Sequence, residues 1–316
     1  MVPNAAEWMK SIPAAYLVFL IISTIATAAA IALAFVHLYA IRYYVRTKDI
    51  RNDLYYLCLI FPIVALTSLL GMYFLRSAMF LNAVAYVYVM ICLLFVVMLL
   101  CDVFGGHEMF VKYLLMRKEQ VRFDRSPFCC CCKFLPTILP TEQNIRYIEW
   151  MTIQSPYVRI ILEIINVIAF FEQTGYAVCS VILNIFKVIS MFSALYGCFI
   201  LIPLGKEKTE LYRITFIFRL VNLTQICLTL QMLIFETIGS FRGFGGSLLA
   251  SHAKAMFWYN AVVTYEMCAM SIAATIYLHP RKCALFDKYK RYCPRDVSIA
   301  NSIPGGPGRP SVTSMG

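Results

Sequence analysis

The sequence predicts an all-α, polytopic membrane protein with seven transmembrane helices, an extracellular N-terminus and a cytoplasmic C-terminus. Of the 316 residues, 61% are hydrophobic and 14% are charged, and the mean hydropathy is +0.72. A soluble domain carries about 25% charged residues, so water is not the solvent for most of this surface. Apolar runs of membrane-spanning length recur along the chain, and basic residues gather in every second connection between them.

Seven apolar runs have lengths suited to crossing about 30 Å of hydrocarbon, which takes roughly 20 residues in a helix. They are Ala14–Ile41, Leu54–Leu75, Met79–Phe104, Val158–Thr174, Tyr176–Leu204, Ile214–Ile238 and Ala255–Leu278. The first run is too long for the apolar region of a signal peptide, so we expect it to remain as a span. Only Phe171–Gly175 separates the fourth run from the fifth, and a single broken segment is the alternative there.

The basic residues indicate the orientation, because Lys and Arg accumulate on the cytoplasmic side of membrane proteins. The connections after the first, third and fifth runs, together with the C-terminal tail, hold 21 of the 28 basic residues. The opposite side holds four, which are Lys10, Arg76, Arg242 and Lys254. The net charge of +11 therefore belongs to the flanks of membrane helices, and no nucleic-acid partner is expected.

The spans divide the chain into three parts. Residues 1–13 form the extracellular N-terminus, residues 14–278 the seven-helix domain, and residues 279–316 a cytoplasmic tail that is basic and then disordered. The longest connection, residues 105–155, is cytoplasmic. Its segment His107–Phe123 mixes apolar and basic residues, so we expect an amphipathic helix along the inner leaflet or an extension of the third span.

Four consecutive cysteines stand in the same connection, and they are Cys129, Cys130, Cys131 and Cys132. Adjacent cysteine side chains diverge, whereas zinc sites use spaced pairs, so no metal site is expected here. A juxtamembrane run flanked by Phe and Lys is typical of S-palmitoylation. We therefore expect lipidation, with unmodified thiols as the alternative.

Polar side chains inside the apolar runs are candidate functional groups, because burying them in a membrane is costly. The candidate substrate path consists of Lys187, Asn184, Arg219, Asn222, Gln225, Gln231 and Glu266, which belong to the last three runs. Such groups either line a path for a substrate or join helices by hydrogen bonds, and both interpretations stay open. Pairing of Lys187 with Glu172, Glu236 or Glu266 is one way to compensate its charge.

Arg159, Glu163 and Asn166 form a second polar set, in the fourth run. Their spacing of i, i+4 and i+7 places them on one helix face. We expect an ion pair within the helix, near the inner membrane interface, or a helix-packing contact.

No catalytic arrangement is evident in the sequence. The four histidines are scattered, and the chain has no H-E-x-x-H, G-x-S-x-G or phosphate-binding loop motif. The sequence therefore predicts no enzyme, no cofactor and no metal.

Five short segments, taken in order, resemble those of one protein family. They are FPIVALTSLLGM (Phe61–Met72), CCCCKFLPTILP after the third run, SALYG (Ser193–Gly197), LTLQMLIF (Leu228–Phe235) and YEMCAM (Tyr265–Met270). Their order and spacing are similar to those of the organic solute transporter alpha-subunit family, which includes the transmembrane-184 proteins. The resemblance covers roughly Ala14 to Leu278, although the stretch entering the sixth run is less basic here.

The resemblance implies facilitated movement of amphipathic organic anions, such as bile-acid or steroid conjugates, across the plasma membrane. It also implies a small single-span beta subunit as partner, and a homo-oligomer is a further expectation. Within a medium of low dielectric, Lys187 and Arg219 would offer positive charge to the anionic head group of the substrate.

Two other functions fit the same topology. A seven-helix receptor shares it, but the end of the third run reads Asp102-Val103-Phe104 and the seventh run lacks Asn-Pro-x-x-Tyr. A membrane organiser that transports nothing, in trafficking or in ciliary or other internal membranes, would use the polar groups only to join helices.

Overall fold

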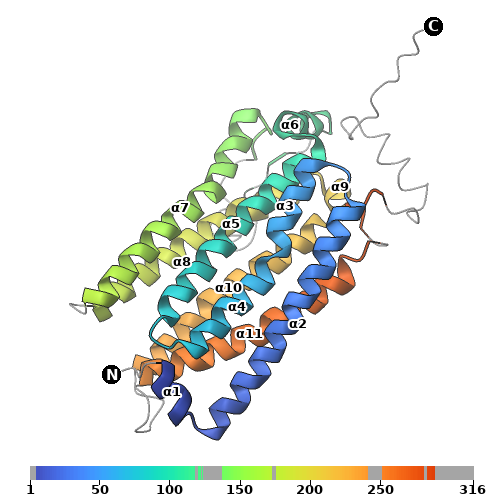
Figure 1. Cartoon of the computed structure of the whole chain (residues 1–316). Helices are drawn as coiled ribbons and strands as arrows, with labels where there is room; N and C mark the ends of the chain where they lie inside the picture. The colour runs from blue at the N-terminus through green and yellow to red at the C-terminus, as the bar shows by residue number, and fades with distance from the viewer. Residues whose placement is uncertain are drawn as a thin grey trace.

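The computed structural model describes residues 5–117, 120, 121, 123, 137–172, 176–240, 251–280 and 283–288. Their helices are α1 (Ala5–Ser11), α2 (Ala14–Tyr44), α3 (Lys48–Cys58), α4 (Ile60–Tyr73), α5 (Ala78–Phe104), α6 (His107–Met116), α7 (Glu142–Glu172), α8 (Tyr176–Leu201), α9 (Lys206–Leu211), α10 (Ile214–Ser240) and α11 (Ser251–Tyr277). Figure 1 shows the long helices side by side in one bundle, with α1 at one end and α6 and α9 at the other. We call these the α1 end and the α6 end.

Six helices of the described part are long and apolar enough to cross a membrane. They are Ala14–Tyr44, Lys48–Tyr73 (α3 with α4), Ala78–Phe104, Glu142–Ala169, Val181–Leu201 and Ile214–Gly239. The expected seventh run lies on α11, which is long enough, at 27 residues, but is not among the six. α11 carries polar residues that face other helices, and Asn260, Thr264 and Ser271 are all buried.

The outward-facing side chains of the bundle suit hydrocarbon. On α2, α7 and α8 many large apolar residues are exposed, and they include Ile21, Ile25, Ile161, Ile168 and Ile185. Exposed apolar surface on this scale is what a lipid environment requires and what soluble monomers avoid. The arrangement confirms a multi-pass helical membrane protein.

The packing places α11 in the middle and the α7–α8 pair at the side. α11 packs against α2, α4 and α10, while α8 packs mainly along α7, and α7 in turn contacts α5. Figure 1 shows α7 and α8 running together at the edge of the bundle. Since these two helices pack side by side, the alternative of one broken segment between 158 and 204 is wrong.

The second span differs from the expected Leu54–Leu75. It begins at Lys48 and divides into α3 and α4 at Leu59. Pro62 explains the division, because proline has no N–H to donate and its ring clashes with the carbonyl four residues earlier. That carbonyl belongs to Cys58, the last residue of α3.

The fourth span also begins earlier than predicted. α7 starts at Glu142 rather than Val158 and continues through Pro156, so the connection expected over residues 105–155 ends in a helix. The charged residues of this segment suggested a loop, but its other face carries Ile145, Ile148 and Thr152, all buried. Tertiary packing of that face stabilises the extra turns.

The segment after the third span forms a separate helix, α6. Gly105 and Gly106, with φ of 92° and 106°, separate it from α5, so the extension of the third span is wrong. α6 ends at Met116, earlier than the expected Phe123. Its apolar side chains, which include Phe110 and Leu114, are buried against the bundle. The four cysteines and the tail beyond residue 288 lie outside the described residues.

Candidate functional site

Three charged side chains meet between α7 and α8, and we call Arg159, Glu163 and Lys187 the ion cluster. Glu163 Oε1 lies 2.9 Å from Arg159 Nε on its own helix, and Glu163 Oε2 accepts a hydrogen bond of 3.0 Å from Lys187 Nζ on α8. The exposed fractions of the three residues are 2%, 6% and 5%. The expected ion pair on α7 is therefore present, but it is buried and includes Lys187.

The face of α7 that carries the ion cluster is set by helical spacing. Arg159, Glu163 and Asn166 are buried, whereas Ile161, Ile164 and Ile168 are exposed. An α-helix in a membrane turns its polar stripe toward the protein interior and its apolar residues toward lipid. This rotation of α7 brings Glu163 to Lys187, a partner that the sequence did not suggest, and of the suggested partners Glu236 also acts on Lys187 electrostatically.

A second polar contact joins α8 to α10 next to the ion cluster. Asn184, one helical turn before Lys187, donates a hydrogen bond of 2.9 Å to Glu236. Glu236 also acts on Lys187 electrostatically. Two carboxylates, Glu163 and Glu236, thus face two cations, Lys187 and Arg159, in an interior where such interactions are strong.

Two tyrosines connect the ion cluster to the rest of the bundle. The Arg159 guanidinium lies over the ring of Tyr86 on α5, 4.2 Å from its centre, which is a cation–π arrangement. The Tyr86 hydroxyl donates to the carbonyl of Leu228 on α10 at 2.7 Å and lies 3.2 Å from the Tyr259 hydroxyl of α11. Four long helices therefore meet through one network.

The ion cluster retains hydrogen-bonding capacity that no described residue uses. Nε and Nη1 of Arg159, Nδ2 of Asn82 and Oδ1 of Asn166 are buried without a hydrogen-bond partner among the described residues. The cavity beside them measures about 20 Å³, which admits about one water molecule. Buried donors left unfilled are costly, so the site has a preference for a group that accepts hydrogen bonds.

The other residues of the predicted path do not all converge on the ion cluster. Gln231 on α10 donates to Glu266 on α11, and Asn222 and Gln225 are buried. Arg219 is exposed. The first α10 residue beside the ion cluster is Thr229, ten positions after Arg219 or about 15 Å along a helix. Arg219 and Lys187 therefore do not form one positively charged site in this structure.

An apolar groove opens beside the ion cluster between α5 and α7. Its volume is about 490 Å³, and its lining includes Phe80, Val84, Ile164 and Ile168, all four of which are exposed apolar residues of the outer surface. Ala83 and Glu163 line both this groove and the small cavity of the ion cluster. The groove thus leads from the lipid-facing surface to the buried charges.

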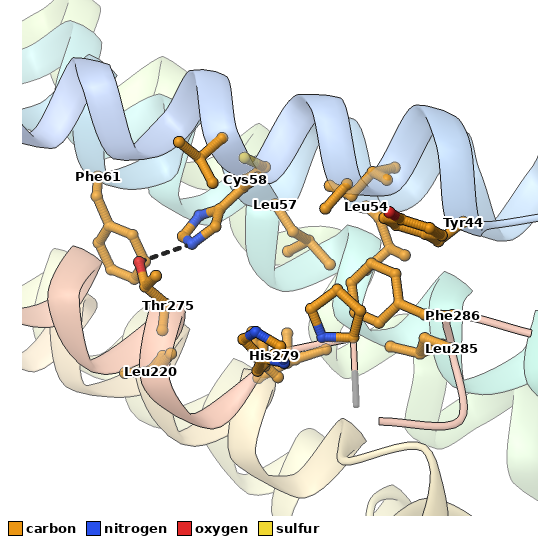
Figure 2. A pocket seen from close by; sticks show the side chains of 18 of the residues that line it. Tyr44, Leu54, Leu57, Cys58, Phe61, Leu220, Thr275, His279, Leu285 and Phe286 are labelled. Carbon is orange, nitrogen blue, oxygen red and sulfur yellow. Dashed lines mark hydrogen bonds between the residues drawn. The ribbon is translucent and has the colours of Figure 1, made fainter. Parts of the chain in front are cut away.

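A second cavity lies between α2, α3, α4, α10 and α11, toward the α6 end, and we call it the inner pocket (Figure 2). Its volume is about 340 Å³, within the range of small-molecule sites. Leu57, Phe61 and Leu220 surround it, with Leu285 and Phe286 of the segment after α11 (Figure 2). Its polar lining includes His279 and a 2.8 Å hydrogen bond between His37 Nε2 and Thr275 Oγ1.

Comparison with known proteins identifies the family. The family model described as "Organic solute transporter Ostalpha" matches residues 19–283. This chain belongs to the organic solute transporter alpha family. Its curated relatives in Caenorhabditis elegans include organic solute transporter alpha-like protein 1, which is 38% identical over 91% of this chain and 76% of the relative. The alpha-like protein 3 is 31% identical over 91% and 84% of the two chains, and no solved structure matches.

Two glycines of the Ostalpha-like segments lie where helices approach closely. A Cβ atom on Gly71 of α4 would lie 2.6 Å from Nδ2 of Asn260 on α11, and one on Gly197 of α8 would lie 2.9 Å from Oγ1 of Thr152 on α7. Both distances are shorter than ordinary contacts. In this family member, these glycines therefore permit the close α4–α11 and α7–α8 contacts.

Proposed function

We propose that this chain is the transporting subunit of a system for facilitated movement of amphipathic organic anions across the plasma membrane. The observation that carries the proposal is the buried Arg159 guanidinium, whose Nη1 has no hydrogen-bond partner among the described residues, while its Nε is ion-paired with Glu163. A sulfate or carboxylate head group supplies the acceptor oxygens that a guanidinium binds best. Family membership supports the role of transporter subunit.

The neighbouring groove suggests how such a substrate would lie. Its apolar body would occupy the groove between α5 and α7, and its head would pass Ala83 to reach Arg159 and Lys187. Because the present cavity of about 20 Å³ holds no organic anion, Glu163 must give way, and α7 with α8 must move from α5. In this proposal the substrate anion replaces Glu163 as partner of Lys187, so two buried cations remain compensated throughout.

The topology and the partners belong to the same proposal. Counting α11, seven helices span the membrane, with the α1 end outside and the α6 end in the cytoplasm. Membrane lipids surround the bundle, a single-span beta-type subunit or a second copy of this chain accompanies it, and Cys129 to Cys132 are lipidated. The charge asymmetry of the connections supports this orientation.

The test is uptake of a radiolabelled steroid sulfate by cells expressing this chain, alone and with a candidate single-span partner. The proposal predicts saturable uptake above that of untransfected cells. Lys187→Met should abolish most of this uptake at equal surface expression, because the anion loses a buried cation. Arg219→Ala is the matched control and should retain it, since Arg219 is exposed. Equal uptake by wild type and Lys187→Met would refute the assigned site.

The small size of the cavity also favours a second candidate function. A closed cluster of charges that binds no substrate would have one role, which is to hold α7, α8 and α10 together. Such a role fits a membrane organiser that transports nothing. Surface-expressed protein without uptake of any tested anion, together with lower thermal stability of Lys187→Met, would support that function.

A further inference from the structure

Three metal-binding side chains meet at the α6 end, far along α5 and α7 from the ion cluster. Cys101 lies in the last turn of α5, His107 is the first residue of α6, and Glu149 lies in the first half of α7. Glu149 Oε1 is 2.9 Å from His107 Nδ1 and 3.5 Å from Cys101 Sγ. The three ligand atoms all lie within 4.8 Å of one another. We propose that Cys101, His107 and Glu149 form a zinc site joining α5, α6 and α7.

The turn between α5 and α6 creates the first half of this site. The N–H of Gly106 donates to the carbonyl of Cys101 at 3.0 Å, and both glycines have positive φ, 92° for Gly105 and 106° for Gly106. Residues other than glycine rarely adopt such a conformation. The reversal brings His107 back beside Cys101 although six positions separate them.

α7 contributes the third side chain from the face that packs on the bundle. Ile145, Ile148 and Thr152 of this face are buried, and Glu149 lies among them with a side chain that is 13% exposed. The His107 side chain is 23% exposed. The site is thus close enough to solvent for a metal ion to enter and sufficiently enclosed to hold it.

The surrounding charges favour a cation. The carboxylates of Asp53 and Asp102 act electrostatically on Cys101, and Asp49 acts on both of these carboxylates. Among the described residues, the ion pair between His107 and Glu149 is the only one that includes any of these acidic side chains. A divalent cation at this point would therefore be attracted by the carboxylates around it.

The ligand types select zinc over the alkaline-earth ions. Thiolate, imidazole and carboxylate together suit Zn²⁺, whereas Mg²⁺ and Ca²⁺ prefer oxygen ligands alone. Bonds of about 2.0–2.3 Å at a tetrahedral angle separate ligand atoms by about 3.3–3.5 Å. The Glu149–Cys101 separation of 3.5 Å matches this range, while His107 and Glu149, 2.9 Å apart, would separate by a few tenths of an ångström when the ion binds. When Zn²⁺ binds, the Cys101 proton leaves to solvent and a Zn–S bond forms. The ion then balances the charges of the Cys101 thiolate and Glu149.

The inference is independent of the transport proposal, and its test uses the full-length protein in detergent. After incubation with Zn²⁺ and removal of free metal, mass spectrometry of the digested protein should find about one zinc ion per chain. Cys101→Ser and His107→Gln should each lower zinc retention at least about tenfold. Replacing Cys129 to Cys132 by Ser is the matched control and should leave one zinc bound. Zinc lost with the four-cysteine variant but kept by the other two would overturn the site.

A second measurement on the unmodified chain covers the case in which a variant fails to fold. Titration with Co²⁺ should produce the absorption bands of tetrahedral cobalt with a thiolate ligand, and Zn²⁺ should displace them. A chelator should also lower the thermal midpoint of the zinc-loaded protein, because metal bound to the native state stabilises it. Absence of a thiolate–cobalt band in protein that is folded would refute the proposal.

Discussion

Two buried lysines of this chain, Lys187 and Lys208, differ in whether an acidic side chain lies beside them. Lys187 has Glu163 at 3.0 Å, whereas Lys208 on α9 is only 2% exposed and lies 4.7 Å over the ring of Phe104. Lys208 has no ion-pair partner among the described residues, and burial lowers its pKa from 10.5 to about 8. The first lysine therefore has a buried counter-charge, and the second is destabilised by its own charge.

Replacing Lys208 by Met should stabilise the protein at neutral pH. The lysine binds a proton less tightly when folded than when unfolded, so at pH 7 its charge is a destabilising term of up to about 3 kcal/mol, from a pKa difference of about 2.5. The cation–π contact with the Phe104 ring offsets part of this destabilisation. Thermal unfolding in detergent between pH 7 and 10.5 measures the effect.

The pH dependence has a definite sign. Between pH 8 and 10.5 the unfolded chain binds more protons at Lys208 than the folded one, so wild-type stability should rise with pH across this interval. Lys208→Met should remove that rise, while Lys206→Met, at a side chain that is 75% exposed, should not. A Lys208→Met protein that melts earlier than wild type at pH 7 would contradict the argument.

Residue types could be predicted from the sequence better than residue partners. Lys187, Glu163 and Asn184 stand out because they are polar within apolar runs. Their pairing depends on the rotation of each helix about its axis, which spacing within one helix does not determine. Tyr86 and Tyr259 were missed, since an aromatic residue in an apolar run gives no signal until Arg159 is seen over one ring.

Helix boundaries were harder to predict than helix existence, for identifiable reasons. Pro62 divides the second span, yet Pro156 lies inside α7 without ending it. The difference is tertiary packing, since buried side chains on both sides of Pro156, including Thr152 and Arg159, hold α7 against its neighbours. Local propensity alone does not contain that information.

The α7–α8 contact provides a test at the scale of helices. Gly197→Ala would place a methyl group 2.9 Å from Thr152 Oγ1 and 3.1 Å from the carbonyl of Ile148. The backbone carbonyl cannot move aside as a side chain can, so the helices must separate. We expect the free energy of unfolding to fall by about 1–3 kcal/mol. The measurement is the thermal midpoint of the purified protein in detergent.

A second substitution separates crowding from other causes. Adding Thr152→Ala to Gly197→Ala removes one of the two close contacts and should restore part of the lost stability. Ile189→Ala, at a side chain of α8 that is 59% exposed, is the control and should change the midpoint little. Additive losses in the double variant would argue against crowding between α7 and α8.

At the scale of the molecule, the inner pocket provides a test of where an amphipathic substrate travels. Leu220 lines this pocket, whereas Leu223 of the same helix is 48% exposed on the outer surface. Leu220→Trp should fill part of the 340 Å³ and reduce uptake at equal surface expression if substrates pass through it. Leu223→Trp should leave uptake unchanged. Unchanged uptake in both variants would assign the passage to the groove beside the ion cluster alone.

The number of spans decides on which sides of the membrane the termini lie. α11 falls outside the six helices that composition identifies, yet its 27 residues extend about 40 Å. It packs against α2, α4 and α10, each of them part of a candidate span. We therefore expect α11 to cross the membrane with these helices, since its buried polar residues are covered by neighbours and need not meet lipid.

Seven spans place the two termini on opposite sides, and six would place them on the same side. An epitope at the N-terminus should therefore be stained on intact cells, and one at the C-terminus only after permeabilisation. This orientation also puts the side rich in basic residues, with 21 of 28, in the cytoplasm. If both epitopes stain on intact cells, or if neither stains before permeabilisation, the termini lie on the same side of the membrane and α11 is not a seventh span.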